Sequence, residues 1–189
     1  MSSHHIVREK QEPALLILSM DNFDPELLGQ LLEWSPTVIA TAHVAEQLNI
    51  RGIKVDRVLG NDVGEVLQSD VSYISIKDTP PVGAALYFLT DENYGAVNIV
   101  TDDFIPADYV EFISRINLVI LHRHQKTYPI TSGFTKWLPH GEVIALHSQP
   151  KALISSGLSQ LETGEFITIA DGVIKLQFAD AFIYISETI

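Results

Sequence analysis

Apolar runs of strand length alternate with segments of helical periodicity through the first two thirds of the chain, and this alternation constrains the fold more than any other feature. The strand-like runs cover residues 14–20, 37–41, 54–59, 71–76, 96–100 and 117–121, and helical spacing is found at 25–34, 43–50, 82–89 and 106–114. Strands that are apolar along their whole length are typical of a parallel sheet covered by helices on both faces. We therefore predict an α/β domain at residues 14–122, built on a doubly wound, mainly parallel sheet.

Proline marks the start of three of the expected helices, and the one at residues 82–89 is entered through Pro80-Pro81. Asp24 precedes Pro25, so an N-cap residue is followed by a proline at the first helical position. Leucines follow at spacings of three and four, which gives this helix one apolar face. Pro106 is expected to open a second helix that runs to about Ser114.

From residue 123 onward the pattern changes to short β-like runs separated by turn residues. Asp171-Gly172 lies between two of these runs and is typical of a β-hairpin turn. We predict that residues 123–189 form a small antiparallel β domain, sandwich-like in architecture. A polar N-terminal arm at residues 1–13 precedes the α/β domain.

Charge and composition exclude several classes of function. The 189 residues include 24 acidic and 12 basic side chains, and the net charge of −12 opposes binding to nucleic acid or to an anionic membrane. The absence of cysteine excludes disulfides, thiolate metal sites and cysteine nucleophiles. No apolar run approaches the roughly 20 residues that span a bilayer, and the first residues lack the apolar centre of a signal peptide. We expect a cytoplasmic protein without nucleic-acid or membrane partners.

Acidic residues recur where the predicted parallel strands end. In an open parallel sheet, ligands bind outside the carboxyl ends of the strands. The acids at these positions are Asp21, Asp62, Asp78, Asp102 and Asp103, with Asp108 in the segment that follows. Such carboxylates could hold Mg²⁺ and the phosphates of a nucleotide. Aspartate also favours turns and helix N-termini, and the residues alone favour that simpler explanation.

Several motifs with well-defined chemistry are absent from the sequence. No GxGxxG, GxxxxGK[ST] or GxSxG occurs, so dinucleotide fingerprints, the P-loop and the nucleophile elbow have no support. His122 and His124 could place two imidazoles on one face, but no third ligand matches them, and we interpret both as surface residues. Trp34 and Trp137 each lie near a proline, and we interpret them as packing residues.

Four segments carry a resemblance to a known family. They are Glu26–Ile39 (ELLGQLLEWSPTVI), Gly52–Gly60 (GIKVDRVLG), Ala96–Val100 (AVNIV) and Asn117–Leu121 (NLVIL). In sequence order these segments resemble the scaffold of the thiamin pyrophosphokinase family. The resemblance implies an α/β domain of the type that binds Mg-ATP, a C-terminal β domain of the type that helps bind thiamin, and a homodimer.

The functional motifs of that family fall on substituted positions. The Asp-Gly-Ala motif falls on Ala42-His43-Val44, the Gly-Asp-Phe-Asp loop on Gly60-Asn61-Asp62-Val63, the Thr-Asp pair on Pro80-Pro81, the glycine-rich segment with its arginine on Asp102–Ala107, the following Asp-His on Asp108-Tyr109, and the Ser-Asn pair near Glu165-Phe166. Of the motif acids, only Asp108 stays clearly in register.

These substitutions bear directly on activity, because phosphoryl-type transfer depends on positioned metal and charge neutralisation. We expect a thiamin pyrophosphokinase-like protein that is catalytically degenerate, keeps the fold and could still bind thiamin, an analogue or a nucleotide. The alternative is an active, divergent enzyme that uses Mg and ATP to transfer pyrophosphate to thiamin or a related alcohol. Asp62, Asp78 and Asp108 would then hold the metal, Asn61, Asp62, Asp103 and Asp108 would bind the cofactor, and Asp108 would be the best catalytic candidate. A structural or partner-binding protein stays open as a third possibility.

Overall fold

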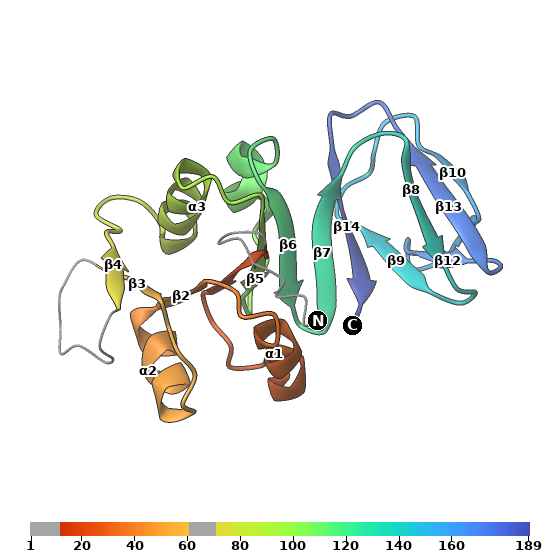
Figure 1. Cartoon of the computed structure of the whole chain (residues 1–189). Helices are drawn as coiled ribbons and strands as arrows, with labels where there is room; N and C mark the ends of the chain where they lie inside the picture. Colours follow the sequence, from red (N-terminus) through yellow and green to blue (C-terminus); the bar gives the residue numbers. More distant parts are fainter. Residues whose placement is uncertain (1–11, 61–70) are drawn as a thin grey trace, which may run out of the picture. The chain divides into compact units, whose positions relative to one another are not determined.

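A computed structural model describes residues 12–60 and 71–189 of the chain. The chain divides into two compact units, Met1–Arg123 and His124–Ile189 (Figure 1). The first unit is mixed α/β and the second is built from antiparallel strands, so the predicted fold class is confirmed. Among the described residues, no helix has the length and apolar character needed to cross a bilayer.

The first unit is organised around a parallel sheet. Its strands are β1 (Ala14–Ile17), β2 (Val38–Thr41), β3 (Arg57–Leu59), β4 (Ser72–Ile74), β5 (Ala96–Val100) and β6 (Asn117–His122). They lie in the order β6-β5-β1-β2-β3-β4 and all of these neighbours pair in parallel. The order in which strands are added reverses at β1: β2 to β4 extend the sheet on one side of it, and β5 and β6 on the other. The loops after β1 and β5 therefore emerge side by side at a topological switch point.

Helices cover both faces of this sheet (Figure 1). They are α1 (Pro25–Leu32), α2 (Ala42–Ile50), α3 (Pro81–Asp91) and the 3₁₀ helix η1 (Pro106–Phe112). Leu28 of α1 and Leu48 of α2 pack on one face with Leu15 and Ile17, while α3 lies on the other side. The two faces of β1 are both buried, which explains why its sequence is apolar throughout.

The start of α1 confirms the predicted cap, whereas the segment after Pro106 differs from the prediction. The Asp24 side chain accepts a hydrogen bond from the Glu26 backbone N–H at 2.7 Å. The expected helix to Ser114 is instead the shorter 3₁₀ helix η1. Its Tyr109 and Phe112 are buried, and such i, i+3 spacing suits the three-residue turn of a 3₁₀ helix.

The second unit is a sandwich of two antiparallel sheets. Its strands are β7 (Gln125–Ile130), β8 (Phe134–Leu138), β9 (Val143–Leu146), β10 (Ile154–Ser156), β11 (Leu158–Gln160), β12 (Phe166–Thr168), β13 (Gly172–Gln177) and β14 (Ile183–Thr188). One sheet has the order β11-β12-β9-β14-β7 and the other β10-β13-β8. Ile144 and Ile185 from the first sheet share one core with Ile174 and Leu176 from the second.

The hairpin predicted at Asp171-Gly172 is wrong. The strands on either side of it, β12 and β13, belong to different sheets: β12 pairs with β9 and β11, and β13 pairs with β8 and β10. The Asp171 side chain instead accepts a hydrogen bond from the His140 backbone N–H at 2.8 Å. Gly172 has a φ of 152°, which favours glycine, and there the chain passes from one sheet to the other.

The packing role predicted for the two tryptophans is also wrong. Trp34 is 70% exposed and Trp137 is 61% exposed. Trp137 lies on β8 between half-buried or buried neighbours, so the alternation of the strand directs it to solvent. Proximity to a proline does not report which face of an element a side chain occupies.

Candidate functional site

The loops after β1 and β5 are tied together by one carboxylate. Asp102 Oδ1 accepts hydrogen bonds from the Asn22 backbone N–H at 3.1 Å and from Asn22 Nδ2 at 3.4 Å. Asp102 Oδ2 lies 3.4 Å from the Asp21 backbone nitrogen, which donates to it. In return, the Asp102 backbone N–H donates to Ser19 Oγ at 2.7 Å. We call this set of contacts the Asp102 bridge.

The Asp102 bridge keeps its carboxylate ionised. Burial alone would raise the pKa of Asp102, but the hydrogen bonds with the Ser19 side chain and with Asn22 and Asp21 outweigh it and lower the pKa below its usual value. Both carboxylate oxygens therefore already have donors from the protein itself. A negative charge fixed here would repel a triphosphate that approached this edge of the sheet.

The neighbouring acid is paired with a basic residue of the same unit. Arg123 Nη2 lies 2.9 Å from Asp103 Oδ1, and Arg123 Nε donates to the Asp102 backbone oxygen at 3.2 Å. Both side chains of the ion pair are largely exposed. Arg123 is thus engaged with an acid of this chain, at an edge where an arginine could otherwise neutralise phosphate charge.

An aromatic stack lies beside these loops. The Phe104 ring stacks on Tyr109 at a centroid distance of 5.9 Å and on His122 at 5.2 Å. Tyr109 is 2% exposed and His122 is 6% exposed. The interpretation of His122 as a surface residue is therefore wrong, because Phe104 covers its ring. Tyr109, which takes the place of a histidine in the family motif, serves as a core residue.

The remaining predicted site residues are either exposed or outside the described part of the chain. Asp78 lies in the turn after β4, and Asp108 lies in η1; both are exposed. Asn61 and Asp62 fall within residues 61–70, which the structure does not describe. In residues 12–60 and 71–189, no three His, Asp or Glu side chains are grouped to hold a metal ion. The proposed set of Asp62, Asp78 and Asp108 stays a prediction.

The two acids after β5 do not fit a Mg-ATP site in this arrangement. A magnesium ion would need carboxylate oxygens at about 2.1 Å, in near-octahedral geometry. The Asp102 oxygens are turned toward the N–H groups of the β1 loop, and an Asp103 oxygen is turned toward Arg123. Coordination of a metal by either residue would break contacts that hold the loops.

The sequence did not identify Ser19 or Arg123 as part of this edge. Ser19 lies just after β1 and Arg123 just after β6. Their position at the carboxyl ends of parallel strands was the signal in the sequence that could have identified them. Their partners, however, depend on which strands are neighbours. Only the pairing of β1 with β5, and of β5 with β6, brings Ser19, Asp102 and Arg123 to one place.

The fold is similar to that of solved thiamin pyrophosphokinases. The enzyme from Geobacillus thermodenitrificans aligns with a TM-score of 0.68 and 13% identity over 93% of this chain and 97% of its own. A probable thiamine pyrophosphokinase from Staphylococcus saprophyticus aligns with a TM-score of 0.68 and 11% identity, covering 94% and 98% of the two chains. The Candida albicans thiamin pyrophosphokinase gives a TM-score of 0.60 and 10% identity, covering 94% and 90%.

Comparisons based on sequence found no match. No protein-family model matches the chain, and no curated protein matches it. The structural likeness extends over both units and confirms the fold expected from the resemblance. At these identities it establishes the fold and leaves activity to be argued from the residues.

Proposed function

We propose that this chain is a thiamin pyrophosphokinase-like protein that has lost catalysis while keeping the fold. The observation that carries the proposal is the Asp102 bridge together with the Arg123–Asp103 ion pair. At the switch point, the Asp102 carboxylate is satisfied by N–H groups of the β1 loop, and Asp103 is satisfied by Arg123. Substitution of the family's motif residues at several separate positions supports the same conclusion.

The physical reason for the loss is electrostatic. In phosphoryl-type transfer the protein supplies little besides positioning and stabilisation of charge on the phosphates. An ionised Asp102 at this edge acts against a polyphosphate, and Arg123 would have to leave Asp103 before it could help. Reopening the edge would break the hydrogen bonds of the Asp102 bridge.

We propose further that the protein is a cytoplasmic homodimer that retains binding of a small molecule. Candidates from the family resemblance are thiamin, its analogues and nucleotides. Retained binding would separate a degenerate relative from a purely structural protein. A ligand that binds only the native state raises the apparent melting temperature, so the distinction can be measured without knowing the physiological ligand.

A turnover assay tests the loss of catalysis. The purified chain is incubated with thiamin, ATP and Mg²⁺, and AMP and thiamin diphosphate are quantified by chromatography. The Geobacillus thermodenitrificans enzyme in the same buffer serves as the positive control. We expect no product above the no-protein blank. Turnover near 1 s⁻¹, an ordinary enzymatic rate, would refute the proposal.

A further inference from the structure

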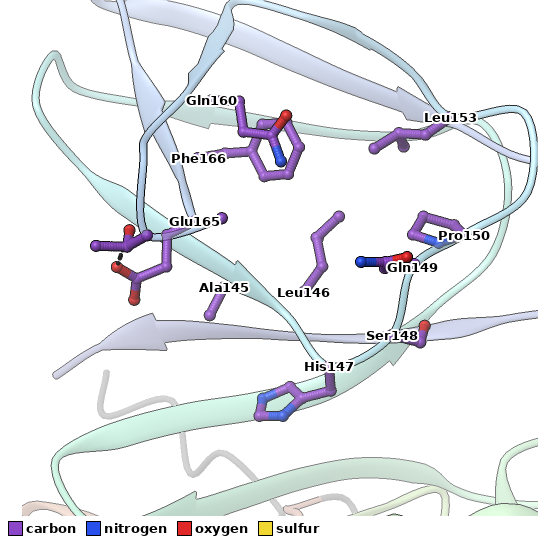
Figure 2. A pocket seen from close by; sticks show the side chains of 12 residues that line it. Ala145, Leu146, His147, Ser148, Gln149, Pro150, Leu153, Gln160, Glu165 and Phe166 are labelled. Carbon is purple, nitrogen blue, oxygen red and sulfur yellow. Dashed lines mark hydrogen bonds between the residues drawn. The ribbon is translucent and has the colours of Figure 1, made fainter.

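The cavities of the two units differ in how they relate to the proposed function. In the second unit, a cavity of about 540 Å³ lies between the end of β9 and the turn that joins β11 to β12 (Figure 2). The family resemblance already implies small-molecule binding by this unit. The first unit has another cavity, of about 390 Å³, which the proposed function does not use. Its volume falls within the range of small-molecule sites, which span about 300–1,000 Å³.

The cavity of the first unit lies beside α1, toward the edge of the sheet where β1 and β2 begin. Glu12 and Pro13 precede β1, and Pro36 precedes β2. Ser19 and Asp102 of the Asp102 bridge follow β1 and β5, at the carboxyl ends of the strands. The cavity therefore lies toward the opposite edge of the sheet from the switch point.

The helix α1 gives this cavity an apolar wall. Leu28 faces the core and is 3% exposed, whereas Leu27 and Leu31 line the cavity one helical turn apart. Trp34, which follows the helix, also lines the cavity and is 70% exposed. An indole that is open to solvent beside a cavity offers a flat apolar surface on which a planar ligand can stack.

A polar residue lies on the sheet side of the cavity. Asn98 interrupts the apolar strand β5, and it pairs in register with Leu15, which belongs to the core beneath α1. Asn98 is therefore on the face of the sheet that α1 covers, where it is half-buried. Within residues 12–60 and 71–189, its side-chain amide makes no hydrogen bond. A half-buried amide without a partner costs free energy, and a ligand that pairs with it would recover part of that cost.

Two further polar groups lie on the wall. Gln30 carries a second amide, and Trp34 carries an indole N–H that can only donate. In the part of the chain that the structure describes, neither side chain makes a hydrogen bond. Among the described lining residues Glu12 is the only charged one, so the wall supplies no cation to attract a carboxylate or a phosphate.

We propose that this cavity binds an uncharged aromatic amide, with its ring stacked on Trp34 and its amide group paired with Asn98. The ring matches the apolar wall of α1, and the amide supplies both the donor and the acceptor that an asparagine side chain can use. A carboxylate of the same shape has no donor and would be repelled by Glu12. Thiamin and nucleotides are charged, so this ligand class differs from theirs, and binding is expected whether or not the protein turns over ATP.

Four benzene derivatives that differ in one substituent provide the test. Benzamide offers a donor and an acceptor, acetophenone only an acceptor, benzoate is an anion, and benzylamine is a cation near neutral pH. Each is titrated into the isotope-labelled full chain up to about 20 mM, because ligands of this size bind in the millimolar range. The sequence has two tryptophans, so the spectrum contains two indole N–H signals, and Trp137→Phe assigns them.

We expect benzamide to shift the Trp34 indole signal in a saturable way and to leave the Trp137 signal in place. Benzamide should bind about fivefold more tightly than acetophenone, because one additional hydrogen bond contributes about that much to affinity. Benzoate should bind more weakly than both, and benzylamine should not exceed benzamide.

A pair of variants assigns the preference to one side chain. Asn98→Leu removes the amide and continues the apolar pattern of β5, so the protein should fold and keep its stability. Asn117→Leu makes the same change at the exposed first residue of β6, outside the cavity. Asn98→Leu should bring benzamide to within about twofold of acetophenone, whereas Asn117→Leu should keep the preference of about fivefold. Circular dichroism and thermal melts check that both variants fold.

Three results would overturn the proposal. The first is that benzamide gives no saturable shift of the Trp34 signal, or that acetophenone or benzoate binds as tightly as benzamide. The second is that benzylamine binds most tightly, since Glu12 and not Asn98 would then select the ligand. The third is that both variants change the preference equally. None of these results depends on the turnover assay, so failure here is separate from failure of the proposed loss of catalysis.

Discussion

Replacing Asp102 by asparagine tests whether the Asp102 bridge is held by charge. The substitution keeps the shape of the side chain and an acceptor oxygen for the Asn22 N–H, which lies at 3.1 Å, but removes the negative charge. The other two contacts, at 3.4 Å, are near the limit for a hydrogen bond and contribute little. Hydrogen bonds to charged groups exceed neutral ones by about 1 kcal/mol, so we expect the free energy of unfolding to fall by roughly that amount. For a chain of this size the melting temperature should fall by about 2–4 °C.

The stability difference between wild type and Asp102→Asn should depend on pH. Because the folded pKa of Asp102 lies below its usual value, the unfolded chain binds the proton more readily. The stabilisation is complete above the ordinary carboxyl pKa of about 3.9 and is lost as the pH falls through the folded value. The difference between wild type and Asp102→Asn should therefore close in acid.

Amide hydrogen exchange at Asn22 and calorimetric melting are the measurements, with Asp103→Asn as the matched control. The Asp103–Arg123 pair is exposed on both sides, so its loss should cost less than about 0.5 kcal/mol. Asp102→Asn should lower protection of the Asn22 amide about fivefold at pH 7, a change that corresponds to roughly 1 kcal/mol. Equal effects of the two variants, or a difference that does not shrink as the pH falls below the ordinary carboxyl pKa, would refute the reasoning.

Three further changes probe the packing and charge of the two units. Tyr109→His introduces the histidine of the family motif but removes a buried ring that stacks on Phe104. The free energy of unfolding in urea should fall by about 2–3 kcal/mol, and no turnover should appear. Recovered activity would contradict this prediction. Lys136→Met removes the ammonium group that lies 2.5 Å from Glu187, whose side chain is 13% exposed. Because the lysine is about one third exposed, the free energy of unfolding measured by calorimetry should fall by only about 2 kcal/mol. No loss of stability would show that water replaces the ion pair. Below the ordinary imidazole pKa of about 6.5, the unfolded chain takes up a proton that His147 resists when folded, so the free energy of unfolding should fall between pH 7 and 5, and His147→Gln should flatten that slope.

The sequence predicted the parts of the fold that depend on local pattern. The apolar runs of β1, β5 and β6 and the Asp24-Pro25 start of α1 were all placed, because burial on both faces and helix capping leave local signals. The prediction of a hairpin at Asp171-Gly172 was wrong because this dipeptide here lies where the chain passes from one sheet to the other. Turn chemistry reports that the backbone bends, and it does not report which strands pair afterwards.

The candidate site could not be derived in the same way, because the role of an acidic side chain depends on the groups that it contacts. From the sequence, Asp102 and Asp103 could hold Mg²⁺ and phosphates or could be ordinary turn residues. The structure shows the first as an acceptor for the β1 loop and the second as the partner of Arg123. Those partners are about 80 and 20 residues away in the sequence, and only strand order brings them together. Sequence periodicity carries no information at that range.

The same dependence on partners bears on what an acidic switch point can bind. In the first unit, backbone N–H groups of the β1 loop satisfy the Asp102 carboxylate, and Arg123 pairs with Asp103. The negative charge of Asp102 would therefore oppose a polyphosphate at this edge of the sheet. Net charge counts both acids alike, whereas their contacts separate a carboxylate held by N–H groups from one held by an arginine.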